Sequence, residues 1–223
     1  RINQDNSTPA LGQINATNPC GEQPLLSGES CNLGSINVGK FIEYVDTTDA
    51  ADVFFDEERF AKVVTTCVRF LDNVVDANQH PTEYTTAMNQ STRKIGLGIM
   101  GFADILIALK IPYNSDTAIT IGRSLISYIR DITDQTSLDL GAMRGAFPSW
   151  DKSDYGHHQP YRNACRMSVA PTGTISMIAD TSSGIEPTFS LVWKKSNILE
   201  GKTLYYVNKF FEATAKKEGF YSD

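Results

Sequence analysis

The sequence has few cysteines, and they follow no pattern of a disulfide scaffold or a metal site. Only four occur in 223 residues: Cys20, Cys31, Cys67 and Cys165. That number is too small for a disulfide-stabilised secreted domain, so we expect a protein of the reducing cytoplasm. No C-x-x-C pair and no Cys/His cluster has metal-ligand spacing. The adjacent His157 and His158 lie in a polar, proline-flanked stretch, which favours a surface loop. We therefore expect no metal site within the chain.

Other features are missing as well. No apolar run is long enough to span a membrane, and no signal peptide opens the chain, so we expect no membrane partner. The net charge is −6 with no run of Lys and Arg, which argues against a nucleic-acid partner. The chain starts at Arg1 without an initiator Met, and we expect it to be an internal piece of a longer protein.

The composition is that of a folded chain. Apolar residues make up 41% and charged residues 21%, which is enough to bury a core and excludes a disordered segment. No repeat, low-complexity tract or clean boundary interrupts the sequence. We therefore expect residues 1–223 to form a single, partial domain.

Periodicity predicts several helices. Apolar residues spaced three and four apart predict one over residues 56–78, with Cys67 on its buried stripe. Further helices are predicted over 102–110, from a cap at Ser115 or Asp116 to about residue 140, and over about 204–217. Gly141 is the expected residue just after the third of these helices.

The remaining segments predict loops and short strands. Residues 1–40 are rich in Asn, Pro, Gly and Ser, which indicates a long ordered loop with short strands, and such loops are usually functional. A short strand is predicted over 166–170. Short strands alternating with long helices indicate an α/β architecture with a mainly parallel sheet.

The glycines at 96, 98 and 101 match G-x-G-x-x-G, the pattern of a dinucleotide site. A dinucleotide site needs a hydrophobic strand before these glycines. The preceding residues 88–94 are mostly polar. The pattern therefore favours close helix–strand packing, where a side chain would not fit.

The turn at residues 171–176 is a better candidate for anion binding. It reads Pro-Thr-Gly-Thr-Ile-Ser, and its small residues would expose backbone N–H groups at the start of a helix. The helix dipole and the hydroxyls of Thr172, Thr174 and Ser176 would favour a phosphate there. Turns of this composition are also common without any ligand.

Asn18, Cys20 and Glu22 alternate in the sequence, and in an extended segment their side chains would share one face. A thiol, a carboxamide and a carboxylate on one face can perform radical or nucleophilic chemistry beside a general base. Cys31 lies eleven residues further on and could face Cys20 across a loop. Cys20 and Cys31 could equally be a chance pair of buried thiols or a structural disulfide.

Several segments resemble the large subunits of ribonucleotide reductases. Residues 17–26 read Thr-Asn-Pro-Cys-Gly-Glu-Gln-Pro-Leu-Leu, and residues 31–37 read Cys-Asn-Leu-Gly-Ser-Ile-Asn; together they resemble the finger-loop region of that family. Residues 93–104, 162–164 and 170–187 agree in the same order. The resemblance spans nearly the whole chain.

The resemblance implies a fold and a set of roles. The fold would be part of a ten-stranded α/β barrel whose finger loop carries the radical cysteine. Cys20 would form the thiyl radical, Glu22 would be the base for the 3′-hydroxyl, and Asn18 would orient the substrate. Cys31 would supply one thiol of the redox-active pair. The phosphate contacts of the substrate would come from the turn Thr172, Gly173, Thr174, Ile175 and Ser176.

The chain departs from the complete family pattern. The partner cysteine of Cys31, the effector region and the electron-relaying cysteine pair are absent, and neither Cys67 nor Cys165 matches these roles. The sequence of residues 18–26 resembles that of the adenosylcobalamin-dependent enzymes more than that of the enzymes with a separate metal-containing subunit.

The resemblance also implies partners. They are a ribonucleoside di- or triphosphate substrate, thioredoxin or glutaredoxin as reductant, and a second copy in a homodimer. The cobalamin contacts cannot be assigned to residues of this chain. Two alternatives remain: the same core driven by a separate radical-generating subunit, and a non-catalytic protein that binds nucleotide phosphates.

Overall fold

The computed structural model describes residues 2–47, 50–156, 159–198 and 201–222. The chain forms two compact units. Unit 1 contains residues 1–36, 57–99 and 124–170, and unit 2 contains residues 37–56, 100–123 and 171–223. The prediction that all 223 residues form one domain stays a prediction. The predicted loop at His157 and His158 lies outside the described residues.

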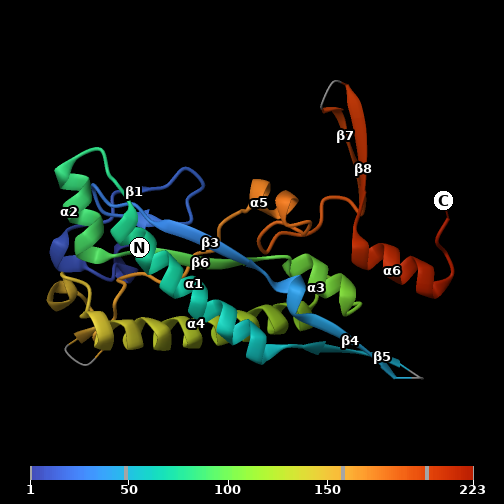
Figure 1. Cartoon of the computed structure of the whole chain (residues 1–223), viewed down its shortest axis with the longest axis horizontal. Coiled ribbons are helices and arrows are strands. Elements are labelled where there is room, and N and C mark those ends of the chain that lie inside the picture. Colours follow the sequence, from blue (N-terminus) through green and yellow to red (C-terminus); the bar gives the residue numbers. More distant parts are fainter. Residues whose placement is uncertain (1, 48–49, 157–158, 199–200, 223) are drawn as a thin grey trace. The chain divides into compact units, whose positions relative to one another are not determined.

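Unit 1 combines long helices with short strands (Figure 1). Its elements, of which β3, β6 and α4 continue into unit 2, are η1 (Ile2–Asp5), η2 (Pro9–Leu11), β1 (Ala16–Thr17), β2 (Pro24–Leu25), β3 (Asn32–Asn37), α1 (Glu57–Ala77), α2 (Glu83–Thr92), β6 (Ile95–Met100), α4 (Asp116–Arg144) and η4 (Trp150–Lys152). Residues 1–40 thus form the predicted long loop with short strands.

The strand β6 is buried along its whole length. It pairs with β3 and, through a parallel bridge from Leu97 to Met167, with the extended segment 165–168. The amides of Ile95 and Leu97 donate to the carbonyls of Cys165 and Arg166 at 2.9 and 3.0 Å. The predicted strand at 166–170 is therefore present only as this bridge.

Two glycines of the G-x-G-x-x-G pattern, Gly96 and Gly98, serve this pairing. A Cβ on Gly98 would lie 2.1 Å from the Ser168 carbonyl oxygen, and one on Gly96 would lie 2.8 Å from Ser168 Cβ. Gly96 and Gly98 lie within the strand and not in the turn after it, which is where a dinucleotide fingerprint places its glycines. Close packing was predicted correctly, but the neighbour is an extended segment and not a helix.

The helices of unit 1 follow the apolar periodicity with two corrections. In α1 the buried residues include Phe60, Val64 and Leu71, whereas Cys67, predicted to be buried, is only half-buried. Helix α4 does not end at Gly141 but continues to Arg144. A Cβ on Gly141 would lie 1.8 Å from the Pro160 carbonyl oxygen, so this glycine permits a close approach within the helix.

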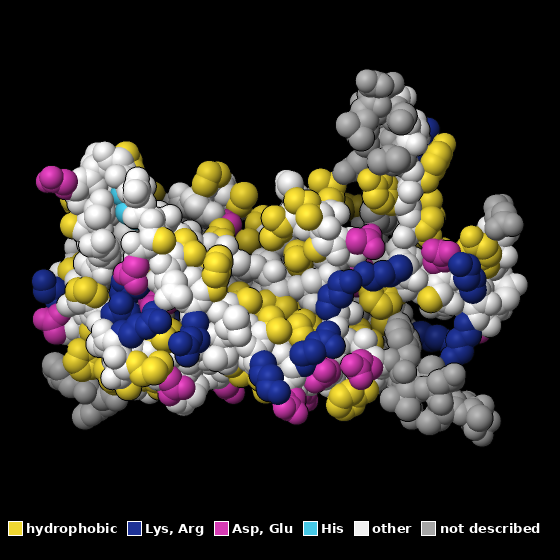
Figure 2. All heavy atoms as spheres, viewed as in Figure 1, with side chains coloured by type: hydrophobic (Ala, Val, Ile, Leu, Met, Phe, Trp, Pro, Cys, Tyr) yellow, Lys and Arg dark blue, Asp and Glu magenta, His cyan; other side chains and the backbone are white. Residues whose placement is uncertain are grey.

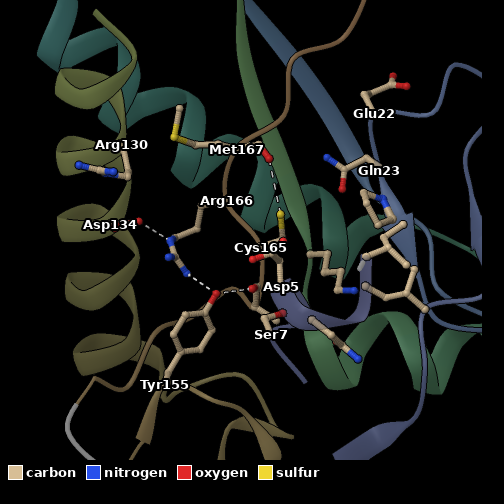
Figure 3. Close-up of a pocket in the computed structure, with 16 residues that line it drawn as sticks. Asp5, Ser7, Glu22, Gln23, Arg130, Asp134, Tyr155, Cys165, Arg166 and Met167 are labelled. Atoms are coloured by element: carbon tan, nitrogen blue, oxygen red, sulfur yellow. Dashed lines mark hydrogen bonds and ion pairs between the residues drawn. The ribbon is translucent and has the colours of Figure 1, made fainter. Parts of the chain in front are cut away.

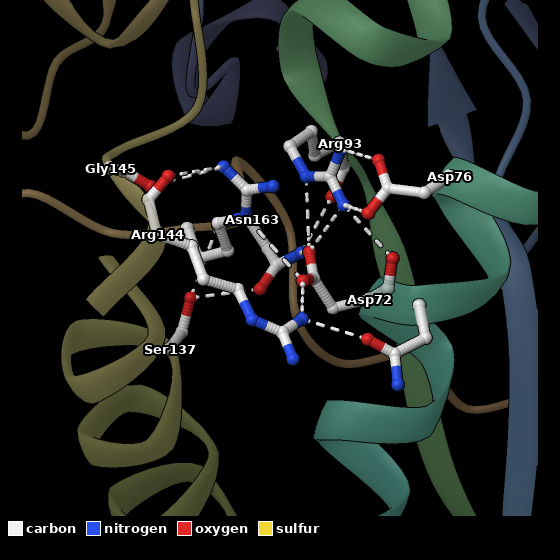
Figure 4. Close-up of polar contacts among 9 residues, drawn as sticks. Asp72, Asp76, Arg93, Ser137, Arg144, Gly145 and Asn163 are labelled. Carbon is white, nitrogen blue, oxygen red and sulfur yellow. Dashed lines mark hydrogen bonds and ion pairs between the residues drawn. The ribbon is translucent and has the colours of Figure 1, made fainter. Parts of the chain in front are cut away.

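A buried carboxylate connects the segments of unit 1 (Figure 4). The side chain of Asp72 is fully buried and forms ion pairs with Arg93, Arg144 and Arg162 at 2.9, 3.2 and 3.4 Å. The amide nitrogen of Asn163 donates to the same carboxylate at 3.0 Å. Because a buried carboxylate is costly without partners, this network requires α1, the C-terminal end of α2, α4 and the 162–163 segment to lie together.

In its described residues, unit 2 contains two antiparallel ribbons, three short α-helices and one 3-10 helix. Its elements are η3 (Val38–Phe41), β4 (Ile42–Thr47), β5 (Ala50–Phe55), α3 (Phe102–Ala108), α5 (Gly173–Ile178), β7 (Val192–Ile198), β8 (Lys202–Val207) and α6 (Lys209–Glu218). The ribbons are β4–β5 and β7–β8. Helix α3 packs against α6 and η3. Ser115, as predicted, caps α4, accepting from the Ala118 amide at 3.2 Å.

Two further expectations are corrected in the described residues. The helix predicted over 204–217 begins only at Lys209, because residues 204–207 form part of β8; their Leu-Tyr-Tyr-Val sequence is rich in residues that favour strands. Parallel pairing does not dominate: β1–β2, β4–β5 and β7–β8 are antiparallel. Strands joined by tight turns can pair only in this way.

The surface carries charges of both signs. Figure 2 shows Lys and Arg side chains beside Asp and Glu on the face in view. Large apolar side chains are also exposed in unit 2, among them Ile178 and Phe189. In the described part of the chain, every helix is too short or too polar to cross a bilayer.

Candidate active site

Cys20 lies in the turn of a small hairpin. Strands β1 and β2 pair antiparallel, with Thr17 opposite Pro24. The amide of Gly21 donates to the Asn18 carbonyl at 3.0 Å, and Gly21 has a φ of 87°, which glycine adopts without steric cost. Cys20 is exposed in this turn. The expectation that residues 18–22 run extended, with alternating side chains, is therefore wrong.

Asn18 closes the hairpin. Its Oδ1 accepts from the Gln23 amide at 3.0 Å, and its own amide donates to the Gln23 carbonyl at 3.3 Å. The buried side chain of Gln23 anchors the base of the turn. The Asn18–Gln23 pair that closes the turn therefore sets the positions of Asn18 and Glu22. The alternation of side chains along a strand does not.

Glu22 is half-buried and attached to the 165–168 segment. Its carbonyl oxygen accepts from Ser168 Oγ at 3.3 Å. Its Oε2 is buried and has no hydrogen-bond partner among the described residues. A buried carboxylate oxygen without a donor is costly, so this oxygen is free to accept a proton or hydrogen bond from a ligand.

Glu22 lines a cavity of about 400 Å³ within unit 1. Gln23, Lys94, Cys165, Arg166 and Tyr155 contribute to its wall. Figure 3 shows Glu22 and Gln23 on one side of the cavity, with Cys165, Arg166 and Tyr155 on other segments. The cavity thus combines carboxylate, amide, thiol and cationic groups.

The opposite wall is built around Arg166. Its guanidinium pairs with Asp134 and lies 4.0 Å from the ring centroid of Tyr161 and 5.2 Å from that of Tyr155. Burial raises the pKa of the Tyr155 hydroxyl. Sequence reasoning missed this cluster, because Asp134 lies on α4 and its partners lie in residues 155–166.

Cys31 directly precedes β3 and is half-buried. Its Sγ lies 3.6 Å from the Asn32 carbonyl oxygen. Burial raises the pKa of the Cys31 thiol, and the nearby Cys165 raises it further, while Lys94 opposes the shift. The thiol is therefore protonated at neutral pH. Cys165 near Cys31 was not predicted, because only the fold brings these two positions together.

All four cysteines are free, so a structural disulfide between Cys20 and Cys31 is not formed. Their close approach across the loop stays a prediction. Within the described ranges, no group of three or more His, Cys, Asp or Glu side chains is arranged to hold a metal ion.

The predicted phosphate turn lies at the start of α5 in unit 2. Thr172 is the residue before the helix, with a φ of 58°, and its Oγ1 accepts from the Gly184 amide at 2.7 Å. Ser176 Oγ is 2.9 Å from Ser183 Oγ. These two buried hydroxyls hold the second turn, 181–184, so they are not free for a ligand.

The other three residues of the predicted turn, Gly173, Thr174 and Ile175, are exposed. Their amides are the first of α5 and, among the described residues, meet no acceptor. The turn at a helix start is therefore confirmed. Its predicted orientation toward Cys20 stays a prediction.

The chain matches one family model along its whole length. Residues 1–161 and 156–223 match the model described as "Ribonucleotide reductase, barrel domain". The chain is similar to the vitamin B12-dependent ribonucleoside-diphosphate reductase of Thermoplasma acidophilum, with 46% identity over the whole chain and 28% of that protein. It is similar to the protein of the same name from Mycobacterium tuberculosis (strain CDC 1551 / Oshkosh), with 44% identity over the whole chain and 31% of that protein.

A solved structure is similar in fold. The class Id ribonucleotide reductase alpha subunit of Actinobacillus ureae matches with a TM-score of 0.70 and 23% sequence identity, over 95% of this chain and 36% of that chain. The match supports the predicted fold class, part of an α/β barrel with a finger loop. The chain spans less than a third of the length of the two curated relatives.

Proposed function

Because this chain belongs to the ribonucleotide reductase barrel-domain family, we propose that it carries part of the active site of an enzyme that reduces ribonucleotides to 2′-deoxyribonucleotides. One observation carries the proposal. The exposed thiol of Cys20 occupies a hairpin turn next to Glu22, whose buried Oε2 has no donor among the described residues. A radical thiol must reach a substrate, and its base must have a free acceptor atom.

In this proposal Asn18, Cys20 and Glu22 each have a separate role in the first step, the removal of hydrogen from the ribose. Cys20, as a thiyl radical, takes the hydrogen from the 3′-carbon of the ribose. The 3′-hydroxyl proton passes to the free Oε2 of Glu22. Asn18 orients the substrate by hydrogen bonding, and its closure of the hairpin keeps Cys20 and Glu22 in fixed relation.

Cys31 serves the second step. It is one of two thiols that together give two electrons and two protons: the 2′-hydroxyl leaves as water, and the two sulfurs form a disulfide. The other thiol belongs to no residue of this chain. The raised pKa of the Cys31 thiol suits a group that must donate a proton at neutral pH. Thioredoxin or glutaredoxin then restores the thiols by exchange.

The substrate's phosphates bind at the start of α5. The exposed amides of Gly173, Thr174 and Ile175 are donors without an acceptor in the described residues. Thr172 and Ser176 act by holding the turn through Gly184 and Ser183. The substrate is a ribonucleoside di- or triphosphate.

The curated relatives named above are vitamin B12-dependent, and this supports the same class here. When bound, adenosylcobalamin supplies the oxidising radical for Cys20. The exposure of Cys20 in the turn fits a thiol that must be reached by such a group. The protein works in the cytoplasm as a homodimer.

Cofactor dependence tests the proposal. The protein expressed from its complete gene is incubated with a labelled ribonucleotide and a dithiol reductant, with and without adenosylcobalamin. We expect deoxyribonucleotide only when the cofactor is present. If turnover instead needs a separate metal-containing subunit, the protein belongs to the class whose radical comes from that subunit. Phosphate binding without turnover under either condition would indicate a non-catalytic nucleotide-binding protein.

A further inference from the structure

A buried ion pair joins the two segments that enter the paired strands β3 and β6: Glu29 lies two residues before Cys31, which directly precedes β3, and Lys94 directly precedes β6. Lys94 Nζ is 2.6 Å from Glu29 Oε2, and only 4% of the lysine side chain and none of the glutamate side chain is exposed. Burying two charges costs free energy that surface residues avoid. Because the pair bears this desolvation cost near Cys31, the thiol proposed to be redox-active, we expect the pair to have a function.

The loop before Cys31 holds the carboxylate in place. Glu29 Oε2 also accepts from the Leu26 amide at 2.7 Å, and the Glu29 amide donates back to the Leu26 carbonyl at 3.1 Å. The buried Asn89 fixes the next residue, accepting from the Ser30 amide at 2.7 Å. Glu29 is therefore rigidly positioned two residues before the thiol.

The two oxygens of the Glu29 carboxylate differ in their contacts. Both contacts go to Oε2, while Oε1 is buried without a hydrogen-bond partner among the described residues. A charge with little solvent around it acts over a longer distance than one in water. Its field therefore extends to neighbouring groups.

Four ionisable groups act on the Cys31 thiol: Cys165, Lys94, Glu29 and Glu22. Three of them, Lys94, Cys165 and Glu22, share the wall of the same cavity. Lys94 lowers the pKa of the thiol, whereas Glu29, Glu22 and Cys165 raise it, in addition to the larger effect of burial. Lys94 is the only cation among the four.

We propose that Lys94 and Glu29 form a positioning pair that sets the charge state of Cys31, an inference that rests on the proposed function. Glu29 favours the thiol, which must donate a proton when water leaves the ribose. Lys94 favours the thiolate, which departs when a thiolate of the reductant attacks the partner sulfur of the disulfide and which then takes a proton from solvent. The opposed charges allow both steps at one sulfur.

The test measures the ionisation of Cys31 without turnover. In the protein expressed from its complete gene, iodoacetamide labelling of each cysteine is followed by mass spectrometry from pH 6 to 10, a range chosen because only the thiolate reacts. We expect Lys94→Met to slow labelling of Cys31 and Glu29→Gln to accelerate it, each by about threefold or more, since half a pKa unit changes the thiolate fraction about threefold. Lys94→Arg keeps the charge and should label like the parent.

Cys67 is the internal control, because its raised pKa arises from burial and no charged group contributes. A purely structural pair predicts that both substitutions loosen the site and accelerate labelling of Cys31 together. That outcome, or unchanged labelling in both, would overturn the proposal. Should Glu29→Gln fail to fold, the comparison of Lys94→Arg with Lys94→Met decides, and equal rates for Cys31 would contradict us. Should Lys94→Met fail to fold, Lys94→Gln takes its place in the same comparison. Opposite shifts without any reductase activity would instead count against the proposed function alone.

Discussion

Ser168 Oγ donates a hydrogen bond of 3.3 Å to the carbonyl oxygen of Glu22, 146 residues away in sequence. It connects the hairpin that carries Cys20 to the segment alongside β6. The position of the Cys20 turn therefore depends on the close contact between Ser168 and the glycines of β6.

Replacing Ser168 with Ala should destabilise unit 1 modestly, because it removes one hydrogen bond of a buried hydroxyl. The expected loss is about 0.5–1.5 kcal/mol in the free energy of unfolding, measured by urea denaturation. The matched control is Val169→Ala, at the neighbouring position, which is 42% exposed. A loss as large in the control would show that the hydrogen bond is not the cause.

Replacing Gly98 with Ala should be far more damaging. The new Cβ would lie 2.1 Å from the Ser168 carbonyl oxygen, so the backbone of one segment must move. We expect a loss on the order of 3 kcal/mol in the free energy of unfolding. Gly173→Ala is the control for thermal unfolding, because nothing lies within 4 Å of its Cβ position. Equal melting temperatures for the two variants would contradict the proposed packing.

Asp72→Asn should cost about 3–5 kcal/mol, because it removes the fully buried carboxylate that pairs with Arg93, Arg144 and Arg162. The carboxylate is fully buried, and 4% of the Arg93 side chain is exposed. Asp131→Asn is the matched control: its pair with Arg130 is exposed on both sides, and such pairs contribute little. Denaturant titration of both variants checks the difference. A small effect of Asp72→Asn would mean that the network in Figure 4 does not hold the segments together.

The contribution of Asp76 to the free energy of unfolding should decrease in acid. A hydrogen bond from Arg93 holds the pKa of the Asp76 carboxyl below its ordinary value. A carboxyl with a lowered pKa in the folded state stabilises fully above its unfolded value of about 3.9 and loses this effect as the pH falls through the folded pKa. The stability difference between the parent and Asp76→Asn, measured from pH 7 to 2, should therefore shrink below about pH 4. A difference independent of pH would refute it.

The sequence predicted the elements that depend on local pattern. Helices α1 and α4 follow from apolar periodicity, with Ser115 as the cap of α4, and the turn before α5 follows from its small residues. What it missed depends on contacts between distant segments: Gly141 is typical of a helix end, but it lies inside α4, where the Pro160 carbonyl comes too close for a side chain. The hairpin turn at Cys20 was hidden by the alternation of polar residues, although Pro19 and Gly21 are typical turn residues.

The same distinction applies to the site. Asn18, Cys20, Glu22 and Cys31 could be named from a resemblance of short motifs. The Lys94–Glu29 pair and the position of Cys165 could not, because residues 29–31, 94 and 165 come together only when β3, β6 and the 165–168 segment are assembled.

The most direct test of the radical-site assignment is product analysis by chromatography with a labelled ribonucleotide, using the protein expressed from its complete gene with cofactor and reductant. Cys20→Ser should form no product, because the O–H bond of Ser is too strong to be activated. The Cys31→Ser variant should still take the 3′-hydrogen from the substrate. The substrate should then decay to free base and a decomposed sugar, because the dithiol that reduces the 2′-position is gone. Cys67→Ser, on α1, should yield deoxyribonucleotide at the parent rate. Substantial activity in Cys20→Ser, or clean multiple turnover with thioredoxin in Cys31→Ser, would contradict the roles assigned to these two cysteines.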